Sequence, residues 1–329
     1  MVLHQKPIFL LESAMPELFI STNGSAVRPR FIKTYHSGSL ESKINEGKIL
    51  LKNCRLCPRN CKVNRYEQGG KICKMGINAR ISSYFPHHGE ESCLTGFGGS
   101  GTIFFSSCNL RCIFCQNWNI SHSCAGREVT PLEIAKIMIN LQDRGCHNIN
   151  FVTPSHVVVQ ILMAISLATE MGLMLPLVYN TSAYDSVESL HLMDGVIDIY
   201  LPDLKFWNSE SANRFMNAPD YPQVSQRNIQ IMHDQVGDLQ VDNQQIAVGG
   251  LLVRHLVLPG HLKETARIIR FLTGCVSPRT ALNIMFQYHP EYKVDKDNFK
   301  DLNRPLSLKE REYAKRMKQE AGLPEYAWV

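Results

Sequence analysis

The 329-residue sequence lacks an apolar run long enough to cross a bilayer. A membrane-spanning helix needs about 20 predominantly apolar residues, and the longest candidate, 161–177, is interrupted by Glu170 and Pro176. The apolar piece 8–11 is broken by Glu12 and Glu17, which is not typical of a secretory signal. We therefore expect a cytoplasmic protein without membrane contact. The acid-poor stretch 21–39 weakly resembles an organelle transit segment, so residues 1–50 leave an organelle matrix as the alternative.

A concentration of basic residues is also missing. The sequence has 35 Lys and Arg against 30 Asp and Glu, and the net charge of +5 is spread along the chain. A nucleic-acid-binding protein more often has a basic stripe with interleaved aromatic residues. Only Arg28, Arg30 and Lys33 form a short basic patch. We therefore expect partners other than nucleic acid.

A glycine-rich dinucleotide fingerprint is absent as well. Such a motif follows a strand and opens a helix, whereas Gly96, Gly98, Gly99 and Gly101 precede the predicted strand 102–106. This order of elements disfavours a nicotinamide-dependent dehydrogenase.

Cysteine, by contrast, is abundant. The chain has 11 cysteines, which crowd between Cys54 and Cys115 at short spacings. Without a secretory signal, this pattern is typical of metal ligation rather than of disulfides.

The regular part of the chain alternates apolar segments with amphipathic ones. Continuous apolar strands are buried on both faces, which indicates a parallel sheet covered by helices. The helix after the first strand has Thr130 as N-cap, Pro131 in its first turn, Glu133 to complete a capping box and Gly145 at its end. Six strand-plus-helix units are predicted, with strands at 102–106, 148–153, 177–180, 196–201, 250–258 and 282–287.

This alternation divides the chain into four predicted parts. We expect an N-terminal extension (1–50), a cysteine-rich metal-binding segment (51–95), an α/β domain (96–295) and a C-terminal helical tail (296–329). Repeated βα units form a barrel, a partial barrel or a doubly wound sheet, and periodicity does not choose among these.

Three cysteines follow the first predicted strand, where parallel α/β folds place active sites. Cys108, Cys112 and Cys115 lie within eight residues, close enough to ligate one iron–sulfur cluster. Three ligands leave one iron open to an outside ligand, as in catalytic metal sites. A zinc site on the same cysteines is the alternative, but structural zinc generally takes four protein ligands.

The motif CNLRCIFC, with an aromatic residue before its third cysteine, resembles the signature of the radical S-adenosylmethionine (SAM) superfamily. The resemblance implies a catalytic [4Fe–4S] cluster on Cys108, Cys112 and Cys115. It implies that SAM binds the open iron and is cleaved reductively to a 5′-deoxyadenosyl radical. It also implies a partial (β/α)₆ TIM-like barrel, to which this chain adds the N-terminal cysteine-rich extension.

A narrower resemblance covers most of the chain. Its segments look like the pyruvate formate-lyase activating enzyme-like branch, and they read CRLCPRNC, TIFFSSCNLRCIFCQNWNIS, NFVTPSH, VYNTSAYD, DIYLPDLKFW, LLVRHLVLPG and NIMFQYHP. The branch implies hydrogen abstraction from a glycine of a glycyl radical enzyme, with flavodoxin or ferredoxin as electron donor. The alternatives are radical modification of a small molecule or RNA, and a non-enzymatic iron–sulfur sensor.

The resemblance also implies SAM-contacting residues at the strand ends. Asp203, Lys205 and Arg254 match such positions, and a guanidinium suits bidentate binding of a carboxylate. The alternative for Arg254 is a buried ion pair. Asn180 and Ser182 are candidate ribose contacts, although Asn and Ser also favour turns.

Two further cofactor-binding candidates flank the motif and the second strand. Phe114 would shield the cluster from water. Ser155 belongs to the segment 153–156, Thr-Pro-Ser-His, which stands where activating enzymes have a Gly-Gly-Glu segment for the SAM amino group. Because this segment differs from Gly-Gly-Glu, the resemblance does not fix how SAM binds or whether the protein is an activating enzyme.

A second cysteine group precedes the barrel. Cys54, Cys57, Cys61 and Cys73 are enough for one closed site. An auxiliary [4Fe–4S] cluster and structural zinc both suit four thiolates, and the spacing does not choose between them or exclude a metal-free segment. The following run His87 to Glu91 is more typical of a solvated loop than of an active-site lining.

Overall fold

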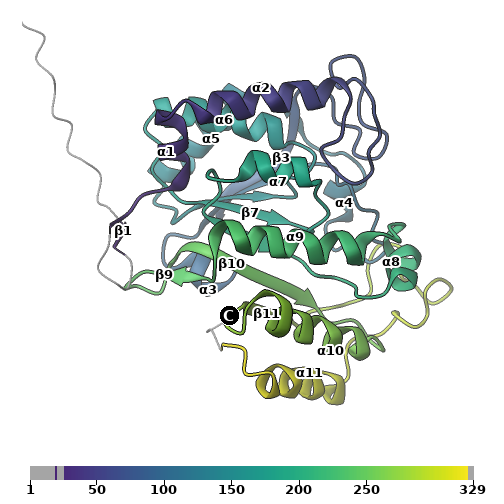
Figure 1. The fold of residues 1–329 in the computed structure, drawn as a ribbon. Coiled ribbons are helices and arrows are strands. Elements are labelled where there is room, and N and C mark those ends of the chain that lie inside the picture. Colours follow the sequence, from purple (N-terminus) through teal and green to yellow (C-terminus); the bar gives the residue numbers. More distant parts are fainter. Residues whose placement is uncertain (1–18, 21–25, 325–329) are drawn as a thin grey trace, which may run out of the picture.

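The computed structural model describes residues 19–20 and 26–324. Six parallel strands form the centre of the main sheet (Figure 1). They are β4 (Ser100–Phe105), β6 (Ile149–Val152), β7 (Leu177–Thr181), β8 (Ile199–Pro202), β10 (Ala247–Leu256) and β11 (Ala281–Met285). All six predicted strands are therefore present, with ends shifted by a few residues.

Antiparallel strands extend this sheet at its β4 side and beside β10. The order is β11-β10-β8-β7-β6-β4-β3-β5, and β9 pairs with β10. The added strands are β3 (Ala79–His87), β5 (Arg127–Val129) and β9 (Gln240–Val241). The main sheet thus begins in the chain at β3, within the predicted cysteine-rich segment 51–95.

The strand order decides between the architectures that the sequence left open. The six parallel strands neighbour one another in chain order, whereas a doubly wound sheet reverses direction at a switch point. The sheet is not closed, because β11 and β5 are its two ends. This arrangement confirms the partial (β/α)₆ TIM-like barrel.

Helices cover the outer face of the sheet (Figure 1). The predicted helix is α5, whose N-cap Thr130 and Glu133 form the expected capping box. The helices between the parallel strands are α4 (Trp118–Ser121), α5 (Pro131–Asp143), α6 (Val158–Glu170), α7 (Val187–Met193), α8 (Ser209–Met216), α9 (Tyr221–Val236), α10 (Leu262–Phe271) and the π-helical turn η1 (Leu272–Val276).

The N-terminal part joins the core of the barrel. A two-stranded sheet, β1 (Phe19–Ile20) with β2 (Ala26–Val27), precedes α1 (Arg30–His36) and α2 (Ser39–Lys52). Helix α2 packs on α6 (Figure 1), and its buried Leu40, Ile44 and Leu51 belong to the same apolar cluster as α5 and α6. A leader within 1–18 or 21–25 lies outside the described residues.

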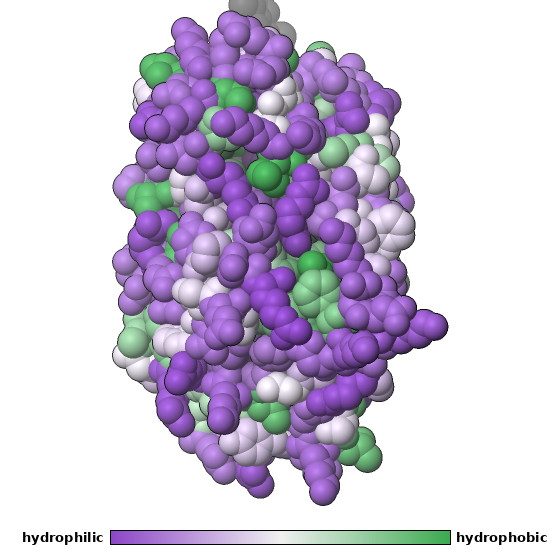
Figure 2. Space-filling model, turned by 90° about the vertical axis from the view of Figure 1, so that its right-hand side faces the viewer, coloured by the Kyte–Doolittle hydropathy of each residue, from purple (hydrophilic) through white to green (hydrophobic). Residues whose placement is uncertain are grey.

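A short helix closes one end of the inner face of the sheet. Helix α3 (Ser92–Thr95) places Cys93 and Leu94 in an apolar cluster with Val178, Ile199 and Leu252 of three parallel strands. At the open edge, α11 (Leu308–Glu320) packs against α10 (Figure 1). Within the described ranges, no helix is long and apolar enough to span a bilayer. Figure 2, seen from the side toward which β10 points, shows a mainly polar face with small apolar patches.

Candidate active site

The loop between β4 and α4 carries Cys108, Cys112 and Cys115 at the carboxyl end of the parallel strands. Its backbone is fixed by tertiary hydrogen bonds, because Ile113 N donates to Phe215 O at 2.9 Å and Lys293 N donates to Ile113 O at 3.0 Å. These bonds come from segments far away in sequence. The loop is therefore positioned by the barrel rather than by local turns.

The three thiols share one partly buried environment. Burial, together with the neighbouring charge of Cys115, raises the pKa of Cys108 to about 11, although the Leu110 backbone N–H acts in the opposite direction. Burial also raises the pKa of Cys112, and Lys205 acts in the opposite direction. The sulfurs thus lie within electrostatic range of one another and of a cation.

Backbone strain accompanies the ends of three neighbouring strands. Ser107, Thr153 and Ala183 follow β4, β6 and β7, and their φ angles are +71°, +60° and +58°. A β-branched residue such as Thr153 rarely adopts this left-handed region. Such strain clusters at functional sites, where the surrounding structure enforces it.

Four predicted SAM-contacting residues meet in one polar network. The Nε atom of Arg254 donates to Asp203 Oδ1 at 2.9 Å, and its Nη2 atom donates to Asn180 Oδ1 at 2.6 Å. The Lys205 ammonium donates to Asp203 Oδ2 at 2.6 Å. Parallel strands bring these side chains together, since Asp203 and Arg254 also form a backbone bridge between β8 and β10.

The charges of this network support one another. Burial alone would raise the pKa of Asp203, but Arg254 and Lys205 hold it below its ordinary value. Burial likewise opposes the charge of Lys205, while Asp203 and then Cys112 raise its pKa. The network therefore connects electrostatically to the cysteine loop.

Phe114 forms the apolar floor of the cysteine loop. Its ring packs edge-on against Phe206 at 5.9 Å and Tyr288 at 6.5 Å between centroids. Cys108 and Cys112 pack against the same apolar cluster. A shell of this kind controls solvent access to a metal site.

Comparison with known proteins identifies the family. The family model described as the radical SAM superfamily matches residues 102–272. The chain belongs to the radical SAM superfamily. Membership implies a [4Fe–4S] cluster and SAM as the cofactors of this radical SAM enzyme. The donor set fits them, because three thiols and a network of carboxylate, ammonium and guanidinium groups meet at one end of the barrel.

Two proteins of Methanocaldococcus jannaschii are similar to this radical SAM protein. Uncharacterized protein MJ0674 is 34% identical over 294 residues, which are 86% of this chain and 79% of that protein. Uncharacterized protein MJ0808 is 27% identical over 124 residues, 31% of this chain and 34% of that protein.

A solved structure is also similar, that of the cobalamin-dependent S-adenosylmethionine radical enzyme OxsB with aqua-cobalamin bound. The TM-score is 0.39 at 12% identity, over 67% of this chain and 31% of OxsB. The radical SAM protein thus matches less than a third of the OxsB chain.

The two predicted serines lie in different surroundings. Ser155 is buried, and its Oγ lies 3.1 Å from Thr181 Oγ1, in a network around the buried Asp185. No hydrogen bond joins Ser155 to Arg254 in the described part of the chain. The Oγ of Ser182 is buried without a hydrogen-bond partner in the described part of the chain, two residues after Asn180. An unpartnered hydroxyl beside the network is available to a bound polar group.

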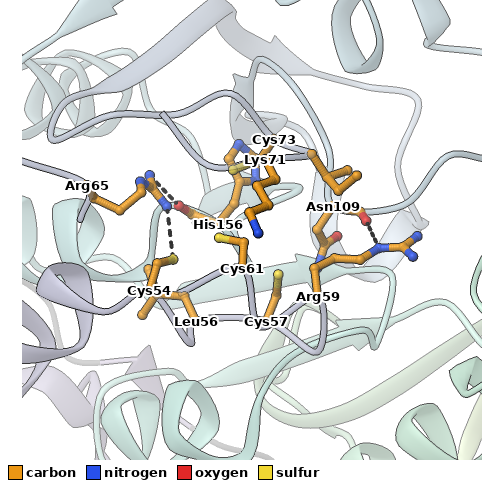
Figure 3. Close-up of a pocket in the computed structure, with 11 residues that line it drawn as sticks. Cys54, Leu56, Cys57, Arg59, Cys61, Arg65, Lys71, Cys73, Asn109 and His156 are labelled. Atoms are coloured by element: carbon orange, nitrogen blue, oxygen red, sulfur yellow. Dashed lines mark hydrogen bonds between the residues drawn. The ribbon is translucent and has the colours of Figure 1, made fainter. Parts of the chain in front are cut away.

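The four N-terminal cysteines line one cavity (Figure 3). Arg65 is almost fully buried beside them, with Nη1 3.7 Å from Cys54 Sγ and Nη2 3.2 Å from His156 O. A side chain at Gly70 would place its Cβ 2.6 Å from Cys73 Sγ, so glycine is required there. The cavity is lined by the four cysteines of the predicted auxiliary site, Cys54, Cys57, Cys61 and Cys73, with Leu56, Arg59, Arg65, Lys71, Ile72, Asn109 and His156.

In the described ranges, no three His, Cys, Asp or Glu side chains are arranged around one metal-ion position. A [4Fe–4S] cluster distributes its cysteine ligands over several iron atoms, so this finding concerns a single ion such as zinc and not a cluster. The cavity nevertheless adjoins the radical SAM motif directly, because Arg59 Nε donates to Asn109 O at 2.9 Å and Asn109 lies next to Cys108.

The interpretation of residues 87–91 as mainly a solvated loop is wrong for its two acids. Glu90 Oε2 lies 3.3 Å from Arg254 Nη1, and Glu91 Oε1 accepts a hydrogen bond from Asn283 at 2.8 Å. Both side chains are buried inside the partial barrel. The apolar Cys93 and Leu94 that follow them were the available signal, because an apolar pair after two acids indicates a segment that turns inward.

Proposed function

We propose that this radical SAM enzyme cleaves SAM reductively at a [4Fe–4S] cluster on Cys108, Cys112 and Cys115 and abstracts hydrogen from a substrate inside the barrel. The supporting observation is that the Asp203, Lys205, Arg254 and Asn180 network adjoins the cysteine loop through Lys205 and Cys112. When bound, the cluster supplies the electron for SAM cleavage.

The residues of the chain divide the remaining tasks. Arg254 and Lys205 offer cationic donors to the SAM carboxylate, and Asn180 and Ser182 offer polar contacts to its ribose. Phe114 and its aromatic neighbours exclude water beneath the cluster. Ser155 acts at most indirectly, through Thr181, because its hydroxyl is occupied in the Asp185 network.

The test is 5′-deoxyadenosine formation by anaerobically reconstituted protein with dithionite and SAM. We expect product from the wild type and from Cys275→Ala, which changes an exposed cysteine outside both groups. Cys112→Ala should form none, because the cluster loses one of three ligands. Product from a folded Cys112→Ala variant, or none from iron-loaded wild type, contradicts the proposal.

We propose further that Cys54, Cys57, Cys61 and Cys73 hold an auxiliary metal centre, either a second [4Fe–4S] cluster or zinc. Their common cavity supports this, because four thiols suit either metal. Mössbauer spectra with iron and zinc quantitation distinguish the two in Cys112→Ala, where a second cluster would retain its iron. Cys57→Ala should lose the auxiliary metal and keep SAM cleavage, whereas an unchanged metal content contradicts the assignment.

The substrate and the electron donor remain predictions from resemblance. Activating enzymes imply a glycyl radical enzyme as partner, with small molecules or RNA as alternatives, and flavodoxin or ferredoxin as donor. Replacing dithionite by reduced flavodoxin or ferredoxin tests the donor, with product formation as the readout. A solely cytoplasmic location also stays a prediction.

A further inference from the structure

An open cleft lies at the edge of the sheet, between β11, α11 and the segment that precedes α3. Arg254 of the proposed SAM site lies at its inner end. Gln116, next to Cys115, donates to Gln287 O at 3.4 Å, so the cleft also borders the cysteine loop. Its volume is about 680 Å³, and its lining includes Glu90, Glu91, Arg254, Phe286, Arg311 and Lys315.

Helix α11 presents two cations to this cleft. Arg311 and Lys315 are four residues apart and therefore lie on one helix face. The Lys315 ammonium lies 5.7 Å from the centroid of the Phe286 ring, which also lines the cleft. The Nε atom of Arg311 is buried and has no hydrogen-bond partner in the part of the chain that the structure describes.

Two other cations on or beside α11 form ion pairs. Arg304 binds Glu310 at 2.8 Å, and Arg316 lies 3.7 Å from Glu320. Arg311 and Lys315 form no ion pair with any acid within 26–324. Two adjacent cations in a cleft, one with a buried unpartnered nitrogen, are an arrangement that an anion stabilises.

A third unpartnered group lies deeper in the cleft. Glu91 is 5% exposed, and its Oε2 atom has no hydrogen-bond partner among the described residues. Its other oxygen is held by Asn283. Burial raises the pKa of Glu91. The unpartnered Oε2 atom is available for a hydrogen bond with a ligand that the two α11 cations anchor.

We propose that this cleft binds the substrate, and that the substrate is a small molecule with a carboxylate or phosphate group. The anionic group pairs with Arg311 and Lys315, and a polar group nearer the middle of the molecule bonds Glu91. The rest of the molecule then points toward Arg254 and SAM. This inference rests on the proposed function, because it names the substrate class of the same site.

A glycine-bearing protein loop suits the cleft less well. An uncharged loop backbone offers Arg311 and Lys315 only neutral carbonyl acceptors, and hydrogen bonds between oppositely charged groups are stronger. Arg311 and Lys315 favour a negatively charged ligand, whereas a glycine loop offers mainly its uncharged backbone for recognition.

The experiment is calorimetric titration of the reconstituted enzyme with inorganic phosphate and with succinate at constant ionic strength. We expect at least one anion to bind, and the double variant Arg311→Gln/Lys315→Gln to bind it about tenfold more weakly or not at all, since a charged hydrogen bond contributes about 1.5–3 kcal/mol. The matched control is Lys309→Gln/Arg316→Gln, which removes two exposed charges of the same helix outside the cleft and should bind as wild type. Lys315→Glu, at an exposed position, provides a second variant with reversed charge.

Three outcomes overturn the proposal. The first is that the wild type binds neither anion, and the second is that both double variants bind the anion equally well. The third is that a short single-stranded RNA binds far more tightly than either anion and that this binding depends on Arg311. Wild-type 5′-deoxyadenosine formation is measured in parallel. Anion binding without SAM cleavage defeats the proposed function and leaves the anion site standing. SAM cleavage without anion binding defeats only the site.

Discussion

Arg254 donates to Asp203 at 2.9 Å from the neighbouring strand, and the same guanidinium reaches Asn180 at 2.6 Å and Glu90 at 3.3 Å. The Arg254 side chain therefore connects the ends of β7, β8 and β10 with the segment that carries Glu90 and precedes α3. A planar guanidinium is suited to several fixed partners at once, and an ammonium is not.

Arg254→Lys should therefore weaken SAM binding by roughly tenfold, because lysine cannot keep the fork of contacts. SAM titration of anaerobic, iron-loaded protein measures this loss. The iron content should be unchanged, since Arg254 is not a cluster ligand. The control is Arg279→Lys, at an ion pair with Asp238 that is 80% exposed on the arginine side. Equal SAM affinity in the two variants would remove Arg254 from the SAM site.

Arg59 connects the auxiliary cysteine cavity to the radical SAM loop. Its guanidinium donates to Asn109 O at 2.9 Å and to the carbonyls of Met216 and Asn217 at the end of α8. Arg59→Ala leaves these carbonyls without their charged donor and should lower the free energy of unfolding by roughly 1–3 kcal/mol.

Urea unfolding of the anaerobic protein measures the effect of Arg59→Ala. Arg55→Ala is the control, since Arg55 is an exposed arginine of the same segment. We also expect slower cluster assembly at Cys108 in the Arg59 variant, because Asn109 is its neighbour. Identical stability of the two variants would show that Arg59 does not hold the loop.

The sequence predicted the elements that have strong local signals. Thr130, Pro131 and Glu133 specified the start of α5, and the cysteine motif indicated the radical SAM superfamily. Asp203, Lys205 and Arg254 were found by resemblance, and parallel pairing of β8 and β10 explains why they meet.

The remaining features depend on tertiary contacts. Polar residues such as Glu90 and Glu91 are usually exposed, whereas here Arg254 and Asn283 on distant strands hold them inside, and His87 lies 3.4 Å from Glu90. Helix α2 is held by apolar contacts with α6, more than a hundred residues later in the chain. The burial of Ser155 likewise depends on Thr181 and Asp185.

Thr130→Ala should destabilise the protein by about 1 kcal/mol, because the hydroxyl accepts the Glu133 backbone N–H at the start of α5. Thr130→Ser keeps the capping oxygen and should remain within a few tenths of a kcal/mol of the wild type. Chemical denaturation measures both. If Thr130→Ser lowers the free energy of unfolding as much as Thr130→Ala, the stabilisation comes from the threonine methyl group and not from the capping hydroxyl.

His255 provides a pH-dependent prediction. Its ring is buried, with Nδ1 donating to Leu204 O at 2.7 Å and Nε2 accepting from Thr265 Oγ1 at 2.9 Å. Burial lowers the pKa of His255 to about 4, below the value of about 6.5 in an unfolded chain. The unfolded chain therefore binds the extra proton first. Stability should fall as pH decreases from about 6.5 to about 4, by up to about 3 kcal/mol from this group.

His255→Asn should unfold more easily at pH 7, since it loses a contact, and its stability should depend less on pH between 7 and 4.5 because the titrating ring is gone. Urea unfolding at pH 7, 6, 5 and 4.5 provides the comparison. His191→Asn, at an exposed position at the end of α7, should keep the wild-type slope. If the unfolding free energy of His255→Asn depends on pH as steeply as that of the wild type, other groups cause the acid sensitivity. The first of these to test is the buried His156, because burial lowers its pKa to about 4.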